Sequence, residues 1–560
     1  MDTKELQETP IWELYQKSVN FMERRHIYRD TDVNHRMYNG DQNYGIKIQS
    51  VEPISHNFIK QVVKQKVSKI TSNYFGINYS PENIENSEFM EPAQKTCDLL
   101  NKKASKLMDK DFMDKKIKKW AKQAAINDEA VAYVTYDFEE NMPVNEVISK
   151  NDIMYGDENE EEIQLQPYIL VRQRKTITQL EEMARKEQID EKLIKEAITD
   201  NNTSTVAGDS GKDEIEDKAW LITMFYRKNG MIHYSQATQY CEIKKDKNMG
   251  LTLYPVAHFN WEDQEGNARG VGEVRNLIPN QLEANKTAMR RALVTKNISY
   301  PQRVINEDSI QNIQDVNKVG TTIRFKDMGN TRASDVFMTT SPGQLGIDSE
   351  KLQNELITLS KDLNNAGDMV TGNINPEQAS GKAILAVQNF QTQPLNEQVI
   401  GLKSFIEDIA RIWFEMWKVY PKNGLTIEVE EVDAINGQTN LRIETIPNYI
   451  MEALKTSVKV DITPKGAFDK YAQELSMENL FVQGKITFEE YIEALEPDSV
   501  MPKSKLEVIL KKRKEKEKQI NMYEKQALQM RNQAQMKMAA SNDIETINQM
   551  GNQLINQATA

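Results

Sequence analysis

The chain has 560 residues and a mass of 64.5 kDa, a length that predicts about two to four domains. Hydrophobic residues make up 39% and charged residues 28%, a balance typical of soluble globular proteins. The formal charge of −13, from 71 basic and 84 acidic residues, argues against a protein that binds nucleic acid tightly in one place.

Three further features of the sequence bear on the class of protein. The only cysteines, Cys97 and Cys241, cannot form a disulfide framework, and we interpret them as reduced, buried thiols. No apolar run approaches the roughly 18 residues that a membrane span needs. The first residues are acidic and polar, unlike a signal region. We therefore expect no contact with a membrane.

The first 269 residues predict an α/β body. Apolar residues at helical spacing predict helices over residues 11–37 and 57–75, and a lysine-rich helical region over 91–127. We interpret this lysine-rich region as a solvated surface, with a DNA-binding groove as the alternative. A capping box at Thr178–Glu181 predicts a helix. Strands are predicted over residues 130–136, 220–227, 231–241 and 253–261, with a hairpin turn at Asn229-Gly230.

A helical hairpin with an insert follows. A helix is expected from Gly270, with an apolar stripe of Val274, Ile278, Leu282, Met289, Ala292 and Leu293. A second helix, from about Asp348, has apolar residues at unbroken 4-3-4-3-4 spacing, a seam suited to a neighbouring helix: Leu352, Leu356, Leu359, Leu363, Ala366 and Val370. The insert between them contains short β-like runs at 303–305, 321–325 and 336–338.

A polar loop then leads into a third helix. The loop is too rich in Gly, Asn and Pro to be helical, and its residues include Thr371, Gly372, Asn373, Asn375, Pro376, Glu377, Gln378, Ser380 and Gly381. The helix resumes at Lys382, and beyond Pro394 it repeats the seam with Leu395, Val399, Leu402, Ile406, Ile409, Trp413, Met416 and Tyr420. Strands at 425–432 and 458–462, a short helix from Pro447 and compact helices over 466–520 follow, one of them with a capping box at Thr487–Glu490.

No motif predicts catalysis. The glycines of Gly372…Gly381-Lys382 lie too far apart for a phosphate-binding loop, and Ala383 replaces the required Ser or Thr. The five histidines and two cysteines form no zinc pattern, and the nucleophile motif G-x-S-x-G is absent. We expect no enzymatic activity, no cofactor and no metal.

The order of short motifs from Gly270 to Tyr420 resembles that of the portal proteins of tailed double-stranded DNA bacteriophages. A "GvG…Q…N" helix matches at Gly270, Gly272, Gln281 and Asn285. A tunnel-loop motif "TG…P…aSG.A" matches at Thr371, Gly372, Pro376, Ala379, Ser380, Gly381 and Ala383. Family members often have glycine just before the strand at 130–136, where this chain has Asn127, Asp128 and Glu129.

The resemblance implies an α+β, predominantly helical fold that assembles as a ring, with twelve copies expected. It implies a wing (1–269), a stem helix (270–298), a clip (299–346) and a second stem helix (347–370). A tunnel loop (371–381), a long helix with the rest of the wing (382–465) and a helical crown (466–520) follow. Residues 521–560 would be a solvated helix, a coiled tube that depends on the oligomer, or disordered.

The function that the resemblance implies is a channel at one capsid vertex, through which DNA is packaged, retained and ejected. The ring would dock the terminase, a head-tail adaptor, and the major capsid or scaffolding protein. The protein would be located in the virion, and in the host cytoplasm during assembly. Two alternatives remain: a component of a nucleic-acid motor or nuclease, and a helical scaffold protein.

Basic residues near the stem and clip are candidates for contact with DNA. A ring repeats each of them around the channel, so their contacts would not depend on base sequence. Ion pairing between subunits is an equally open interpretation. The residues are Lys286, Arg290, Arg291, Lys296, Arg303, Lys318, Arg324, Lys326 and Arg332.

Overall fold

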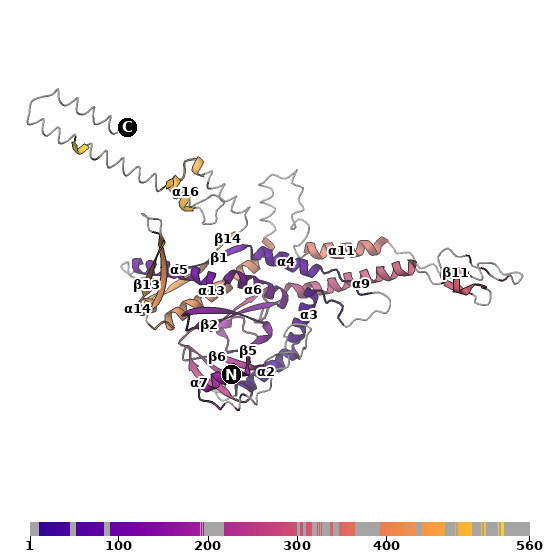
Figure 1. Cartoon of the computed structure of the whole chain (residues 1–560), viewed down its shortest axis with the longest axis horizontal. Coiled ribbons are helices and arrows are strands. Elements are labelled where there is room, and N and C mark those ends of the chain that lie inside the picture. Colours follow the sequence, from indigo (N-terminus) through magenta and orange to yellow (C-terminus); the bar gives the residue numbers. More distant parts are fainter. Residues whose placement is uncertain are drawn as a thin grey trace, which may run out of the picture. The chain divides into compact units, whose positions relative to one another are not determined.

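The computed structural model divides the chain into two compact units, Met1–Thr463 and Pro464–Ala560. It describes residues 10–44, 52–82, 90–190, 192, 194, 218–299, 303–305, 310–315, 322, 324, 326, 337–339, 347–363, 393–422, 424–432, 439–464, 477, 480–494, 506, 509, 510, 525 and 528–530. Helices and antiparallel strands both contribute substantially, which makes the protein α+β, as expected (Figure 1).

Residues 11–39 form two helices, and the prediction of a single helix over residues 11–37 was wrong. Helix α2 (Ile11–Arg24) ends before His26, which has φ 61°, and α3 (Ile27–Asn39) begins after it. The left-handed backbone at His26 interrupts the helical hydrogen bonds. Helix α4 (Phe58–Ile70) buries all the apolar positions expected of it, but it ends earlier than predicted. Strand β1 (Asn73–Pro81) follows it and was not predicted.

The lysine-rich region forms two helices, α5 (Met90–Lys110) and α6 (Met113–Asn127). They are separated at Phe112, which has φ 50°. The predicted strand is present as β2 (Glu129–Asp137), the central strand of an antiparallel sheet with β3 (Met142–Ile148) and β9 (Val256–Asn260). Helices α6 and α13 (Asn396–Val419) pack on this sheet, where the rings of Trp120 and Phe405 meet edge to face at 5.2 Å.

A five-stranded antiparallel sheet lies beside the first one. Its strands are β4 (Ile153–Tyr155), β5 (Tyr168–Thr176), β6 (Lys218–Lys228), β7 (Met231–Ala237) and β8 (Glu242–Asn248), of which β5 and β6 are labelled in Figure 1. One face packs against α2, and the other shares a core with β2 and β9. The hairpin at Asn229 and Gly230 is confirmed, because both residues have positive φ, as a type I′ turn requires.

The start of α7 (Ile177–Lys186) corrects another prediction. The capping box consists of Thr176 and Gln179, two residues before the predicted pair, because β5 continues as far as Thr176. The hydroxyl of Thr176 is thus the first side chain able to accept a hydrogen bond from the helix N-terminus.

The chain from Leu425 to Thr463 completes the first unit. Strand β12 (Leu425–Val432), as predicted, pairs with β13 (Thr439–Ile446), which was not predicted. Helix α14 (Asn448–Ala453) precedes β14 (Thr456–Pro464), and β14 pairs with β1 from the other end of the unit. In the second unit, α16 (Phe488–Ala494) begins with the predicted capping box, in which Thr487 and Glu490 exchange hydrogen bonds.

Candidate functional site

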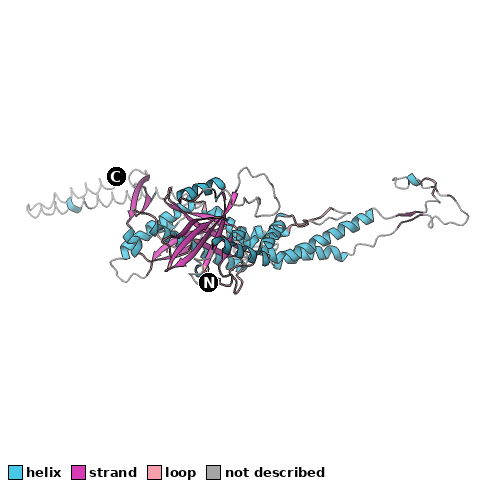
Figure 2. Ribbon diagram, turned by 90° about the horizontal axis from the view of Figure 1, so that it is seen from below, coloured by secondary structure: helices cyan, strands magenta, loops and turns pink. Residues whose placement is uncertain are grey.

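Two helices lie side by side and extend from the body of the first unit (Figures 1 and 2). They are α9 (Glu273–Ser299) and α11 (Ile347–Leu363). Beyond them, β10 (Arg303–Ile305) pairs antiparallel with β11 (Phe337–Thr339), so that Arg303 faces Thr339. Two of the three β-like runs expected in the insert are therefore strands. The described residues of the third run, Thr322 and Arg324, are not in a strand.

The two glycines of the first motif allow close backbone approach at the base of α9. A Cβ atom on Gly270 would lie 2.5 Å from the carbonyl oxygen of Glu262. A Cβ atom on Gly272 would lie 2.9 Å from the backbone nitrogen of Asp128. Both distances are too short for a real side chain, so only glycine brings α9 this close to β9 and to the start of β2.

The first residue of α9, Glu273, is buried and hydrogen-bonded to side chains of two other segments. Glu273 accepts hydrogen bonds from the Lys66 ammonium at 2.7 Å and from the Trp261 indole at 3.2 Å, and its side chain is 2% exposed. Lys66 belongs to α4 and Trp261 follows β9. A buried carboxylate is stable only with such partners, so this contact ties α9 to two other elements.

The two polar residues of the same motif hold the N-terminus of α4. The Gln281 side-chain oxygen accepts from the backbone N–H of Phe58 at 3.1 Å, and its amide nitrogen donates to the His56 carbonyl at 2.7 Å. Asn285 donates to the Gln42 side-chain oxygen at 2.7 Å. Gln281 and Asn285 are almost fully buried, so we assign them to the anchoring of α9 rather than to a surface contact.

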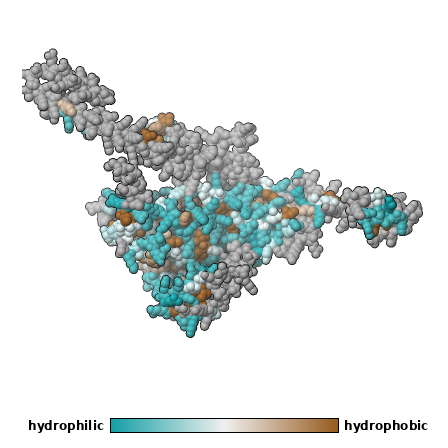
Figure 3. Space-filling view, viewed as in Figure 1, coloured by the Kyte–Doolittle hydropathy of each residue, from teal (hydrophilic) through white to brown (hydrophobic). Residues whose placement is uncertain are grey.

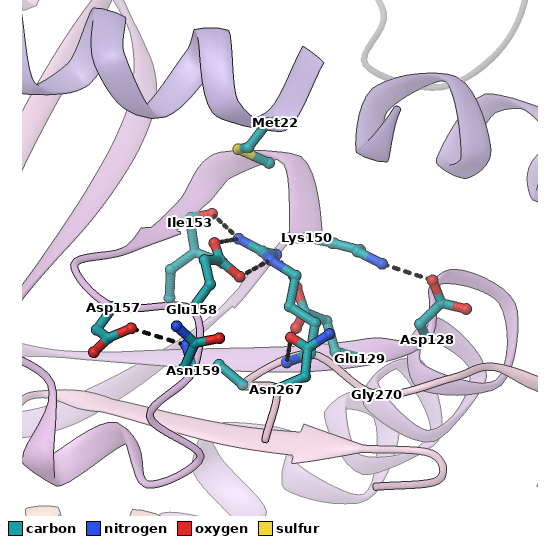
Figure 4. A network of polar contacts seen from close by, with 12 residues as sticks. Met22, Asp128, Glu129, Lys150, Ile153, Asp157, Glu158, Asn159, Asn267 and Gly270 are labelled. Atoms are coloured by element: carbon teal, nitrogen blue, oxygen red, sulfur yellow. Dashed lines mark hydrogen bonds and ion pairs between the residues drawn. The ribbon is translucent and has the colours of Figure 1, made fainter. Parts of the chain in front are cut away.

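A network of buried charges lies next to Gly270 and Gly272, at the base of α9 (Figure 4). The Arg269 guanidinium forms ion pairs with Glu129 and with Glu158, and donates to the Ile153 carbonyl at 3.2 Å. His258 Nε2 lies 3.1 Å from Glu129. Burial by itself would raise the pKa of the Glu129 carboxyl, but Arg269, His258 and Lys150 outweigh it and lower this pKa to about 2. Glu129 therefore stays ionised at neutral pH.

The predicted basic residues are only partly described. Lys286 and Arg290 are exposed on α9, and both form ion pairs with Glu283, at 3.5 and 3.2 Å. Arg291 is half-buried, whereas Lys296, Arg324 and Lys326 are exposed. Arg303 is in β10, while Lys318 and Arg332 lie outside the described residues. One Glu283 facing two cations leaves a net positive charge on this part of α9.

The seam residues of α11 do not all face α9. Leu352 is 49% and Leu359 is 57% exposed, whereas Leu356 and Ile357 are half-buried and Ser360 is buried. The side chain of Leu363 lies outside the described ones. On the face drawn in Figure 3, hydrophobic residues appear as separate small patches in a mostly hydrophilic described surface. Part of the α11 seam is therefore left uncovered by a single chain.

The seam of α13 behaves differently, although it has the same period. Leu402, Ile406, Ile409, Trp413 and Met416 are at most 1% exposed. They belong to the largest core of the first unit, together with residues of α4, α6 and β1. The partner of this seam is therefore the chain's own body.

The predicted tunnel loop, residues 371–381, and the start of the third helix at Lys382 lie outside the described residues. Among the residues that are described, no three His, Cys, Asp or Glu side chains gather in a way that could hold a metal ion. Within the same part of the chain, no helix is both long and apolar enough to span a membrane.

The sequence did not single out Asp128, Lys150, Arg269 or Lys66 as residues that position α9. One signal was available for Asp128. Asp128 stands just before β2, at a position where the family that this sequence resembles often has glycine, and its φ is 75°. A glycine in one sequence and an aspartate in another are both explained by a left-handed backbone that few residue types tolerate.

Comparison of the sequence with known proteins identifies no family for this chain. No protein-family model and no curated protein matches the chain in sequence.

Proposed function

We propose that the protein is a phage portal protein, whose copies form a ring around a DNA channel at one capsid vertex. The observation that carries the proposal is the α9–α11 pair. It extends from an α+β body, ends in paired strands, and leaves Leu352 and Leu359 exposed. Burying apolar side chains of this size contributes about 1.5–3 kcal/mol each, so neighbouring copies offer a ready partner for them.

In this proposal the anchored base of α9 sets the direction of the channel wall. The glycines, Gln281 and Asn285 hold α9 against the body, so that every copy would present its α9–α11 pair at the same angle. A ring repeats each exposed cation once per copy. Arg275, Lys286 and Arg290 share one exposed side of α9, and their repetition would attract DNA phosphates without reading base sequence.

The proposed partners are double-stranded DNA, the terminase, a head-tail adaptor, and the major capsid or scaffolding protein. In this proposal residues 270–298 and 347–370 are the stem, 299–346 the clip, 371–381 the tunnel loop and 466–520 the crown. The protein would have no catalytic site of its own and would act in the virion, after assembly in the host cytoplasm.

Light scattering and negative-stain microscopy of the purified full chain test the proposal. We expect a species many times heavier than the 64.5 kDa chain, rings with a central hole, and no hydrolysis of ATP by the protein alone. A stable monomer at micromolar concentration, or a filament, would contradict it. ATP hydrolysis or DNA cleavage by the pure chain would favour the motor or nuclease alternative instead.

A further inference from the structure

Helix α6 has an exposed face made of lysines. Lys115, Lys118, Lys119 and Lys122 follow one another at i, i+3, i+4 and i+7, which places them on one side of the helix. All four are exposed, while Ile117, Trp120 and Ala121 between them are buried. We call these four residues the α6 lysine face.

The described residues provide little countercharge for this face. The only acidic residue of α6 is Asp114. None of the four lysines forms an ion pair within the described part of the chain, in contrast to Lys116, which pairs with the buried Asp111. Lys122 lies 5.0 Å and Lys60 of α4 lies 5.8 Å from the centre of the Tyr38 ring, so the positive surface extends towards α4.

The position of the face is unfavourable for the helix itself. Lys115, Lys118 and Lys119 lie in the first two turns of α6, where the helix dipole disfavours positive charge. In a chain of formal charge −13, a concentration of unpaired cations at such a place adds nothing to folding. This favours a role in binding an anionic partner.

The chemistry of the face fits a phosphate backbone better than a protein surface. Lysine is depleted in the buried centre of protein interfaces, which depend on aromatic and other apolar anchors. Between Lys115 and Lys122 the exposed side offers no apolar residue. The four lysines span roughly 10 Å along the helix axis, over which one DNA strand presents about three phosphates.

We propose that the α6 lysine face is a second contact for double-stranded DNA, separate from the α9–α11 pair and blind to base sequence. The identity of DNA as the partner rests on the proposed function, whereas the anionic chemistry rests on the face alone. The contact is electrostatic, so it weakens as salt displaces the lysines from the phosphates.

The test uses the full-length protein and a short fluorescent duplex of arbitrary sequence. Affinity is measured by anisotropy over a series of salt concentrations, for the wild type and for K115Q/K118Q/K119Q/K122Q. A matched control, K17Q/K95Q/K245Q/K247Q, removes the same net charge from exposed lysines that already pair with Glu13, Glu91, Glu242 and Glu187. Assembly size is recorded for every variant.

We expect the slope of log affinity against log salt to become less negative by about 0.9 for each lysine that contacts a phosphate. With all four engaged, the wild type loses about a hundredfold more affinity than the α6 variant between 50 and 200 mM salt. The control should keep the wild-type slope, and a duplex of another sequence should bind equally.

Equal slopes for the two quadruple variants would overturn the proposal. Displacement of the duplex by polyglutamate at equal charge concentration would assign the face to acidic proteins instead. Phe112 precedes α6 and is 72% exposed; if F112A weakened binding as much as the quadruple variant, an aromatic anchor rather than the lysines would govern the contact. Assembly size is scored separately, so a wild type that fails to form rings would contradict the portal function and leave the slopes to decide this proposal.

Discussion

The backbone N–H of Gly272 donates a hydrogen bond to the Oδ1 atom of Asp128 at 2.7 Å. The Oδ2 atom of the same carboxylate accepts from the Lys150 ammonium at 2.6 Å, and Asp128 itself has φ 75°. One buried side chain thus joins the start of α9, the start of β2 and the turn after β3. Its contact with Gly272 requires that Gly272 have no Cβ atom.

We therefore expect Gly272→Ala to lower the free energy of unfolding by about 1–3 kcal/mol, the usual cost of forcing an extra methyl group into a filled site. The new Cβ would lie 2.9 Å from the backbone nitrogen of Asp128, which cannot move without shifting β2. The control is Gly76→Ala, whose nearest contact is a flexible Tyr74 side-chain atom at 3.3 Å. Urea denaturation should show a clearly smaller loss for the control, and equal losses would contradict the role of the close approach.

The Glu129 network predicts a defined acid sensitivity. Arg269, His258 and Lys150 outweigh the effect of burial and lower the pKa of Glu129 from 4.5 to about 2 in the folded protein. Between these pH values the unfolded chain binds a proton that the folded chain does not. The stabilisation is therefore complete above about pH 4.5, is lost as the pH falls to 2, and amounts to about 3 kcal/mol.

Glu129→Gln should flatten the dependence of unfolding free energy on pH within that window. It should also destabilise the protein at pH 7 by about 3–5 kcal/mol, because Arg269 loses the fully buried one of its two carboxylate partners. The exposed Glu139→Gln is the control, and it should behave as the wild type. An unchanged pH slope in Glu129→Gln would show that other carboxylates determine the acid sensitivity.

Substitutions in the α11 seam should affect assembly, whereas substitutions in the α13 seam should affect folding. Leu359→Asp places a charge at a residue that is 57% exposed in the single chain, so the subunit should fold but fail to assemble. Lys351→Ala, on the exposed surface of the same helix, should change stability by no more than about 0.5 kcal/mol and leave assembly intact. Leu402→Asp, at a fully buried position of α13, should prevent folding.

Circular dichroism for folding and light scattering for size distinguish these outcomes. If Leu359→Asp and Lys351→Ala assembled equally well, the uncovered seam of α11 would not be an interface between copies.

Removal of Asn373 to Glu377 should leave ring formation and incorporation into proheads intact, while DNA passage or retention fails. Apart from Ile374 and Pro376 these residues are polar, and none is lysine or arginine, so the segment offers only weak, exchangeable hydrogen bonds to a passing backbone. The measurement is the length of DNA packaged and held in particles built with the shortened protein. Full-length, stably held genomes would show that the segment only connects two helices. A failure to assemble would show that the segment is needed for the structure of the ring.

Local patterns in the sequence determined much of the secondary structure. The inward face of α4, the strand at Leu425–Val432, the Asn229-Gly230 turn and the capping box at Thr487 were all predicted where they occur. Each of these depends on residues close in sequence: a period of 3.6 or 2, or a turn that only certain side chains can form. The break at His26 escaped prediction because its left-handed backbone has no such residue signal.

The tertiary structure alone decided what covers each apolar face. The seams of α11 and α13 have the same spacing, yet Leu359 is largely exposed and Leu402 is buried in the core. The spacing of apolar residues shows that one side of a helix is apolar. Which part of the protein covers that side depends on segments far away in the chain. The same reason explains Asp128 and Gly272, which are 144 residues apart and meet through one hydrogen bond: no local pattern specifies a contact over that separation, and only the packed fold brings the two together.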